Sequence, residues 1–325
     1  MSGQEYRQVY VDGWAAASAA GDAASTWAAI KSGTSALRHD AELGWCGLLA
    51  AQPCTNLVAL ASAVAAPLAS RLGEWPVVAI SASKGDTPAF LGGEPDPARL
   101  SAFLPGHFSM AVTRSLGVRH HQGITPVAAC STGLYGLLAA ADAIEHGLAG
   151  SALAGAADAS MQPLLRAGFA SLGVMAQRQP QAFTGAATGF AIGEGAGFLR
   201  LNRSGGSWQV RAGIRLGDAS HPTACDDPAV LHRCLDHLWS ICPEPDLIVA
   251  HATGTRLGDS YELGGLNAGP WRDAKRVCCK PVIGHCLGAS GAVELACALE
   301  DAGPRLWKLG LGFGGHIAAV ALERC

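Results

Sequence analysis

The feature that most constrains how this chain can fold is a glycine-spaced block that occurs twice. Residues 129–136 read Ala-Cys-Ser-Thr-Gly-Leu-Tyr-Gly, and residues 284–291 read Gly-His-Cys-Leu-Gly-Ala-Ser-Gly. Aligning the blocks brings three pairs of residues into register: Cys130 with His285, Gly133 with Gly288, and Gly136 with Gly291. A single glycine match would mean little, but three pairs in register indicate an internal duplication.

The two halves also continue in the same way. After an Ala- and Leu-rich helical segment, each ends in a Gly-rich turn and an apolar strand, at residues 193–201 and 312–322. Between the halves, residues 203–207 read Arg-Ser-Gly-Gly-Ser, which is typical of a linker. We therefore expect an N-terminal half, residues 1–204, and a C-terminal half, residues 205–325. A pseudo-twofold axis would bring the two helix N-termini together at the centre.

Short strands alternate with longer helices along the chain, which favours an α/β fold. Apolar runs at residues 74–81, 151–158 and 246–251 predict strands, and residues 57–68 predict a buried helix. The third strand delivers His251 at its carboxyl end, where ligands bind in open α/β sheets.

Composition argues against several classes of partner. The net charge is −3, and the charged residues, 15% of the 325, form no basic or acidic run. Nucleic acid and anionic membrane surfaces are therefore not expected partners. No apolar run reaches the roughly 18 residues of a membrane span, and the N-terminus lacks the order of a signal peptide. The 11 cysteines follow neither a disulfide framework nor a zinc-site spacing, which favours the reducing cytoplasm.

Cys130 is the leading candidate for a nucleophile. It follows an apolar stretch and precedes a helical pattern that runs to about Gly147. The dipole and the free N–H groups at a helix N-terminus favour a thiolate, and the small neighbours of Cys130 allow a substrate carbonyl to approach closely. The alternative is a buried structural cysteine, which we expect the other cysteines to be. Spacing alone leaves both interpretations open.

Two histidines could supply what such a nucleophile needs. His251 precedes Thr253 and Thr255, whose hydroxyls could hold a ligand; the alternative is a core histidine that closes a strand. His285 is expected at a helix N-terminus, which should keep its imidazole neutral and able to donate a hydrogen bond. Lys280 is either a solvated surface lysine or a cation that sets the protonation of both histidines.

Three further features are less specific. Asp259 and Glu262 either belong to the site or are ordinary cap and helix residues. The Gly-rich segment 312–315 is a hairpin turn, or it presents a backbone N–H that forms an oxyanion hole with the N–H of Cys130. The polar segment 218–228 is, by itself, a loop.

Together these residues resemble the β-ketoacyl-[acyl-carrier-protein] synthases of the thiolase-fold superfamily. The resemblance is to the elongating branch, which uses Cys-His-His, and not to the branch that uses Cys-His-Asn. Five blocks carry it, in the family's order: residues 129–133, 193–197, 251–262, 280–291 and 312–315. Residues 24–35 and 218–228 are similar to two further segments of the family, so the resemblance spans nearly the whole chain. It implies a thiolase-like α/β fold with two duplicated halves packed as a five-layer αβαβα core.

The resemblance implies decarboxylative Claisen condensation of a Cys-bound acyl group with a malonyl thioester, in fatty acid or polyketide biosynthesis. Cys130 would carry the acyl group, and His251 and His285 would hold the malonyl thioester carbonyl. The N–H groups of Cys130 and Phe313 would form the oxyanion hole, and Phe313 also matches the family's gating phenylalanine. Lys280 and Glu262 would tune and orient the histidines. The positions that would contact substrate are Thr253, Thr255, Thr223 and Gly314.

Partners and cofactors follow from the same resemblance. An acyl carrier protein would present the substrates on its phosphopantetheine arm, or CoA would take its place. We expect no permanently bound cofactor and no metal, because two histidine donors can stabilise the enolate. Thiolase-fold proteins pair through a strand near the nucleophile, so the resemblance implies a dimer; such pairing also covers an edge strand that would otherwise invite aggregation. A homodimer is expected, and a heterodimer with another ketosynthase-like subunit stays open.

The chain also departs from the family. It is shorter before Cys130 and between Cys130 and His251, which predicts a more open or differently shaped acyl pocket. Ala252 stands where the family usually has Gly, and His316-Ile-Ala-Ala stands where it usually has Thr-Asn-Ala-His. His316 is either a new polar group near the pocket or simply a loop residue.

Two other functions remain open on the same scaffold. One is acyl transfer that forms an ester or amide without condensation, although that chemistry needs fewer of the residues present here. The other is a non-catalytic partner subunit of a ketosynthase heterodimer. Such subunits typically lose the nucleophile, and this chain has Cys130.

Overall fold

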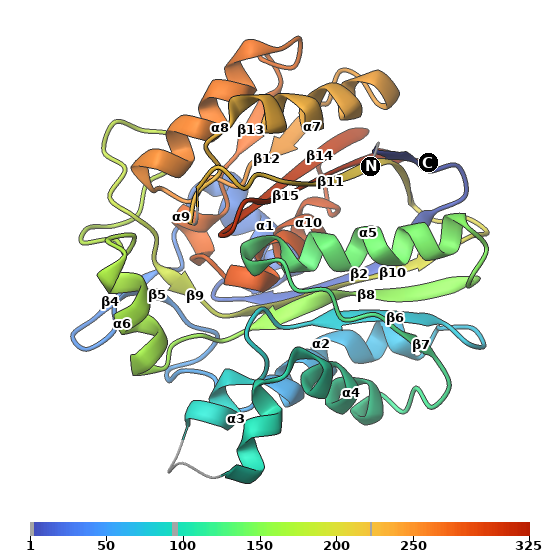
Figure 1. Cartoon of the computed structure of the whole chain (residues 1–325), viewed down its shortest axis with the longest axis horizontal. Helices are drawn as coiled ribbons and strands as arrows, with labels where there is room; N and C mark the ends of the chain where they lie inside the picture. The colour runs from blue at the N-terminus through green and yellow to red at the C-terminus, as the bar shows by residue number, and fades with distance from the viewer. Residues whose placement is uncertain (1–2, 93–96, 222) are drawn as a thin grey trace.

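The computed structural model describes residues 3–92, 97–221 and 223–325, and its main sheet contains two halves of five strands each (Figure 1). The strands of the N-terminal half are β2 (Tyr10–Ser18), β6 (Val77–Ser81), β7 (Gln122–Gly123), β8 (Ser151–Asp158) and β10 (Gly195–Asn202). Those of the C-terminal half are β11 (Trp208–Gly217), β12 (Leu247–Val249), β13 (Lys275–Val277), β14 (Arg305–Gly312) and β15 (His316–Arg324).

The two halves repeat one topology. When the five strands of each half are numbered along the chain, their order across the sheet is third, second, fourth, fifth and first, with the third strand at the outer end. In each half the second strand pairs parallel with its two neighbours, and the other two pairings are antiparallel. The halves join where β2 and β11 pair, with Val11 opposite Trp208. Two short strands extend the edges of this junction: β1 (Gln4–Glu5) pairs with β11, and β3 (Gly21–Asp22) pairs with β2. The repeated order is what the duplicated sequence blocks predict.

Helices separate and cover the half-sheets, so that layers of helix and sheet alternate across the molecule in the order αβαβα (Figure 1). The middle layer holds α5 (Thr132–Glu145) and α10 (Ser290–Ala298), with α1 (Ala23–Ser32) packed against α10. The outer face of the C-terminal half is covered by α7 (Pro228–Ile241) and α8 (Arg256–Ala268). The outer face of the N-terminal half is covered by α2 (Leu57–Ala69) and α4 (Pro105–Ser115). This is the predicted αβαβα arrangement.

The remaining elements are short. The helices are α3 (Thr87–Leu91), α6 (Pro163–Ser171) and α9 (Lys280–Ile283), and the 3-10 turns are η1 (Pro97–Phe103), η2 (Ala129–Ser131) and η3 (Leu287–Ala289). A separate small sheet consists of β4 (Arg38–Asp40), β5 (Gly44–Gly47) and β9 (Ile192–Gly193). None of the helices in the described part of the chain is long and apolar enough to cross a membrane.

The two central helices approach each other through glycines. A Cβ atom on Gly133 of α5 would lie 2.9 Å from the Cβ of Ala292, and one on Gly291 of α10 would lie 2.6 Å from the Cγ of Leu134. Both distances are below normal carbon–carbon contact, so only glycine permits this approach. The N-termini of α5 and α10 therefore meet at the centre of the molecule.

The predicted register of the repeat is wrong by three residues. A 3-10 turn precedes each central helix, and the equivalent hydrogen bonds run from the N–H of Ser131 to the carbonyl of Ala128 and from the N–H of Ala289 to that of Cys286. This equivalence places Cys130 opposite Gly288, not opposite His285. The imidazole of His285 thus comes from the extended segment that leads into η3.

Strand and helix positions otherwise follow the apolar runs. The strand expected at residues 151–158 has those bounds as β8, and the helix expected at residues 57–68 is α2. The strands expected at 74–81 and 246–251 are shorter, because β6 starts at Val77 and β12 ends at Val249. All eleven cysteines are free thiols.

Candidate active site

Cys130 lies in a strained turn at the floor of a cavity. Ala129, directly before it, has a φ of 47°, a left-handed conformation that is costly for a residue with a side chain. The Thr132 hydroxyl holds this turn by donating to the carbonyl of Ala129 at 2.7 Å and accepting from the N–H of Ala128 at 3.0 Å. The thiol is largely buried, with 8% of the residue exposed.

A cavity of about 440 Å³ opens in front of Cys130. Seven residues singled out from the sequence line it: Cys130, Thr223, His251, Thr253, Thr255, His285 and Phe313. Much of the remaining wall is apolar and comes from Leu172, Val174, Phe190, Leu257, Tyr261 and Leu311. Lys280 and Glu262 lie behind this wall, buried, and Gly314 is exposed outside the lining. The structure therefore brings most of the candidate residues to one cavity.

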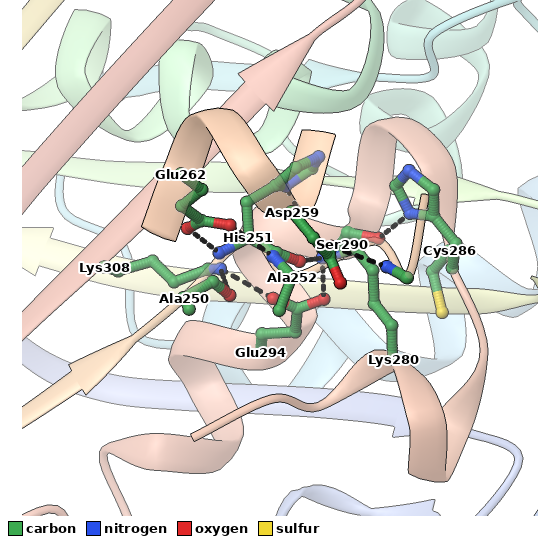
Figure 2. Close-up of polar contacts among 12 residues, drawn as sticks. Ala250, His251, Ala252, Asp259, Glu262, Lys280, Cys286, Ser290, Glu294 and Lys308 are labelled. Atoms are coloured by element: carbon green, nitrogen blue, oxygen red, sulfur yellow. Dashed lines mark hydrogen bonds and ion pairs between the residues drawn. The ribbon is translucent and has the colours of Figure 1, made fainter. Parts of the chain in front are cut away.

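Glu262 holds the backbone turn that carries His251 (Figure 2). One of its carboxylate oxygens accepts the N–H of His251 at 2.6 Å, and the other accepts the N–H of Ala252 at 2.7 Å. Ala252 has a φ of 46°, so these bonds support a second strained turn. Asp259, one turn earlier on α8, accepts the N–H groups of Gly254 and Phe183 in the same manner. Both acids therefore position backbone, and neither lines the cavity.

Two buried lysines lie behind His251 and share one carboxylate (Figure 2). Lys280 donates to Glu294 at 2.7 Å and to the carbonyl of His251, and its ammonium lies 3.5 Å from Nδ1 of the imidazole. Lys308 donates to the other oxygen of Glu294 at 2.6 Å and to the carbonyl of Ala250 at 3.2 Å. We call Glu262, Lys280, Glu294 and Lys308 the buried charge cluster.

His285 faces the same cavity from the other side. Its ring centroid lies 5.5 Å from that of His251, and the two rings are nearly perpendicular. Nδ1 of His285 lies 2.8 Å from the Ser290 hydroxyl, and the edge of the ring packs against Phe190. The backbone N–H of His285 donates to the carbonyl of Ala191 at 2.7 Å, which ties the segment to the start of β9.

Both histidines are neutral near physiological pH. Burial, together with the positive charge of Lys280, holds the pKa of each imidazole well below its ordinary value. An ammonium group can only donate, so the Nδ1 atom of His251 accepts and its Nε2 atom carries the proton. The sequence predicts that a helix N-terminus keeps His285 neutral; in the structure, burial is the larger cause of its low pKa.

The thiol of Cys130 is not stabilised as a thiolate. Burial raises its pKa to about 11, although Lys84, Lys280 and a hydrogen bond from the N–H of Phe313 act in the opposite direction. The expectation of a favoured thiolate is therefore not met. Regular helix begins only at Thr132, so the helix terminus contributes less than the loss of water.

The glycine-rich segment places the N–H of Phe313 against the Cys130 sulfur. A Cβ atom on Gly312 would lie 2.6 Å from the carbonyl oxygen of Ala128, so the two segments approach as closely as backbone allows. A Cβ on Gly315 would lie 1.6 Å from the carbonyl oxygen of Asp218, which locks the turn against the loop at residues 218–228.

That loop is held by Asp218 and places Thr223 at the cavity. Hydrogen bonds from Ser220, Asp226 and Asp227 outweigh the effect of burial and lower the pKa of the Asp218 carboxyl to about 2. Pro222, one residue of the segment, lies outside the described residues.

His316 starts β15 and does not line the cavity. Its ring packs edge-on against Tyr135, and its carbonyl accepts the hydroxyl of Ser131 at 3.0 Å. This position favours a structural role over a new polar group at the pocket. In the part of the chain that the structure describes, no group of three or more His, Cys, Asp or Glu side chains could hold a metal ion.

Three residues of the site were missed from the sequence: Ser290, Glu294 and Lys308. Glu294 and Lys308 each interrupt an apolar segment, Ala-Val-Glu-Leu-Ala in α10 and Leu-Trp-Lys-Leu-Gly in β14. A charge within a segment that must be buried is a signal that a partner lies nearby. Ser290 gave no comparable signal.

Comparison with known proteins identifies the family. The model of the β-ketoacyl synthase N-terminal domain matches residues 77–205, and that of the β-ketoacyl synthase C-terminal domain matches residues 212–300. This chain belongs to the β-ketoacyl synthase family. The two matched regions fall in the two halves of the fold.

Named relatives support the assignment. The chain is 33% identical over 190 residues to 3-oxoacyl-[acyl-carrier-protein] synthase I, chloroplastic, of Arabidopsis thaliana. The matched region covers 51% of this chain and 40% of that protein. It is 30% identical over 235 residues to 3-oxoacyl-[acyl-carrier-protein] synthase 2 of Rhizobium meliloti, which covers 63% of this chain and 56% of that protein. The chain thus matches only about half the length of these relatives.

Solved structures share the fold over almost the whole chain. A chain from a complex of a type II polyketide synthase acyl carrier protein with its ketosynthase superimposes with a TM-score of 0.85 at 21% identity, covering 99% of this chain and 100% of that chain. A chain from the ishigamide ketosynthase/chain length factor superimposes with a TM-score of 0.83 at 21% identity, covering 98% and 100%. These neighbours establish the thiolase-like ketosynthase fold.

Proposed function

We propose that this protein is a condensing β-ketoacyl synthase. It would join a Cys130-bound acyl group to a malonyl thioester by decarboxylative Claisen condensation, in fatty acid or polyketide biosynthesis. One observation carries the proposal: the Cys130 thiol, the N–H of Phe313 and two neutral histidines converge on a single cavity of about 440 Å³. Each group is of the type and protonation state that the condensation uses.

The first step is acyl transfer to Cys130. The sulfur attacks the thioester carbonyl of the incoming acyl group, and the N–H groups of Cys130 and Phe313 stabilise the oxyanion. The carrier thiol leaves and takes up the proton that Cys130 gives up, so the exchange is proton-neutral overall. A thiol with a pKa of about 11 suits this exchange, because no free thiolate persists in the site between turnovers.

The second step is decarboxylation and carbon–carbon bond formation. His251 and His285 donate Nε2–H bonds to the thioester oxygen of the malonyl group, which stabilises the enolate formed as carbon dioxide leaves. Lys280 keeps the proton of His251 on Nε2, and a Ser290 hydroxyl that donates to Nδ1 has the same effect on His285. The enolate carbon attacks the Cys130 thioester, and the released sulfur takes up one proton.

The substrate arm would enter past the threonines. Thr253 and Thr255 lie at the cavity with their hydroxyls 2.8 Å apart, and Thr223 faces the cavity from the loop at residues 218–228. These hydroxyls suit the amide groups of a phosphopantetheine arm, on an acyl carrier protein or on CoA. Gly314, outside the cavity lining, would contact the arm only at the entrance. The relatives named 3-oxoacyl-[acyl-carrier-protein] synthase favour the carrier protein as partner.

The assembly and cellular setting are also proposals. The edge strand β7 suits a homodimer. A heterodimer with a second ketosynthase-like subunit is supported by structural neighbours described as a ketosynthase with its chain length factor. Eleven free cysteines suit the cytoplasm. The division at residue 204 and the altered acyl pocket stay predictions.

Intact-protein mass spectrometry tests the function directly. Wild type and Cys130→Ala are incubated with acyl-carrier protein thioesters and then with malonyl-carrier protein. We expect a Cys130-dependent acyl adduct that disappears as the β-ketoacyl product forms. An adduct that ignores malonyl thioester but discharges to amines or alcohols would establish a non-condensing acyltransferase. No adduct from any thioester would indicate a non-catalytic partner subunit.

A further inference from the structure

Lys308 is a fully buried lysine in the middle of a core strand. It is 0% exposed, and its neighbours Trp307 and Leu309 on β14 belong to the hydrophobic core. Lysine is almost never fully buried unless it is paired, because removing an ammonium group from water costs several kcal/mol. Its position therefore needs an explanation that apolar packing does not supply.

The contacts of Lys308 converge on the turn that carries His251 (Figure 2). Its ammonium donates to the carbonyl of Ala250, and Lys280 donates to the next carbonyl, that of His251. Glu262 accepts the two successive N–H groups of His251 and Ala252. Glu294 bridges the two lysines. The backbone on both sides of the imidazole is thus fixed by charged side chains and not by sheet pairing alone.

Lys308 also completes a charge balance. The buried charge cluster contains two cations, Lys280 and Lys308, and two carboxylates, Glu262 and Glu294. The other titratable groups facing Lys308 are uncharged: the thiol of Cys279, whose pKa burial raises, and the two neutral imidazoles. Without Lys308, the cluster would hold a net negative charge directly behind His251.

We propose that Lys308 is a positioning residue of the active site. It holds the His251 turn through the Ala250 carbonyl and Glu294, and its positive charge adds to that of Lys280 in keeping His251 a neutral hydrogen-bond donor. The effect of Lys308 on the reaction rate rests on the proposed condensing function. Its effect on the imidazole can be measured without turnover.

The test compares Lys308→Met with Lys275→Met, a control that removes an exposed lysine from β13, at the end of the same half-sheet. A charge within about 4–6 Å shifts a pKa by about 1–3 units, and Lys308 is the weakest of the charges that lower the pKa of His251. We therefore expect the NMR titration midpoint of His251 to rise by up to about one pH unit in Lys308→Met only. The acid limb of the pH profile of kcat should move to higher pH by the same interval.

Two outcomes would overturn the proposal. One is an unchanged His251 titration in Lys308→Met, and the other is a loss of kcat that is equal at all pH values, which would assign Lys308 a structural role only. If Lys308→Met does not fold, Lys308→Met/Glu294→Gln restores a neutral cluster. The His251 midpoint of this double variant should lie close to that of wild type, and a raised midpoint would contradict the charge argument.

The two proposals fail separately. If wild type shows no condensation while the His251 midpoint still depends on Lys308, the proposed function is wrong and the assignment of Lys308 stands. If wild type condenses and the midpoint does not depend on Lys308, the proposed function stands and the assignment of Lys308 is wrong.

Discussion

The Cys130 thiol should ionise, and become reactive, only at a much higher pH than an ordinary thiol does. The sulfur lies in an apolar cluster with Cys46, Leu48 and Met161, and only 8% of the residue is exposed. Loss of water disfavours the thiolate, and the nearby cations and the N–H of Phe313 compensate only in part, which leaves a pKa of about 11.

The size of the effect follows from the thiolate fraction. At pH 8 a thiol with a pKa of about 11 is about 0.1% ionised, whereas a free cysteine with a pKa of about 8.5 is about one quarter ionised. Alkylation proceeds through the thiolate, so Cys130 should react with iodoacetamide roughly 200-fold more slowly than a model thiol at pH 8. Its rate should then rise about tenfold per pH unit up to pH 10.

The assay is peptide mapping by mass spectrometry after timed alkylation between pH 7 and 10.5. Cys325, an exposed thiol, reports on the reagent in the same sample, and Cys130→Ala identifies the peptide. A rate for Cys130 that levels off at or below pH 8.5 would refute the burial argument. It would show instead that Lys84, Lys280 and the Phe313 N–H outweigh desolvation.

Three further predictions test the histidines, the central packing and the substrate arm. Because the pKa values of His251 and His285 lie well below 6.5 only in the folded state, the contribution of these two groups to the free energy of unfolding should be constant above pH 7 and fall below about pH 6.5. The limiting slope is about 2.7 kcal/mol per pH unit for two groups, and a flat urea-denaturation profile between pH 7 and 5 would contradict both shifts. Gly197→Ala places a Cβ 2.4 Å from the backbone nitrogen of Val293, so it should displace α10 and lower the free energy of unfolding by about 1–3 kcal/mol. In the control Gly168→Ala the new Cβ meets nothing within 4 Å, and Tm should not fall. Equal Tm changes in the two variants would count against the close packing. Thr253→Val should raise KM for the carrier thioester about fivefold with kcat nearly unchanged, as for one lost hydrogen bond, and the opposite split would remove Thr253 from the arm site.

Local pattern was enough to predict the elements, but not how the two halves superimpose. The strand at residues 151–158 and the helix from Leu57 follow directly from apolar runs. Glycines recur at a spacing of three in both blocks, so a shift by three residues still pairs Gly133 with Gly291. Sequence identity therefore favoured the wrong register, which pairs two glycines where the observed register pairs one. The choice depends on how α5 and α10 cross, which is a property of packing in three dimensions.

The protonation of the site could be predicted only in part for a similar reason. The neutral state of His285 was expected, but from the wrong dominant cause, and the thiolate of Cys130 was expected from a helix terminus that burial outweighs. Desolvation depends on which segments cover a group, and those segments are distant in sequence. Likewise, Lys308 and Glu294 stand out as charges in apolar segments, but only the fold shows that they meet each other.

Strain and buried charge occur together at this site, and each explains the other. Three described non-glycine residues near the site have φ values between 44° and 47°: Ala129, Ala252 and Leu287. Each lies within two residues of Cys130, His251 or His285. Each such residue costs of order 1–3 kcal/mol, and the conformation persists only where the surroundings hold it. At Ala252 the supporting bonds come from Glu262, whose buried carboxylate is stabilised by these N–H groups and further by the cations of Lys308 and Lys280. The charged groups that tune the histidines are therefore also the groups that hold the strained backbone aiming them at the cavity.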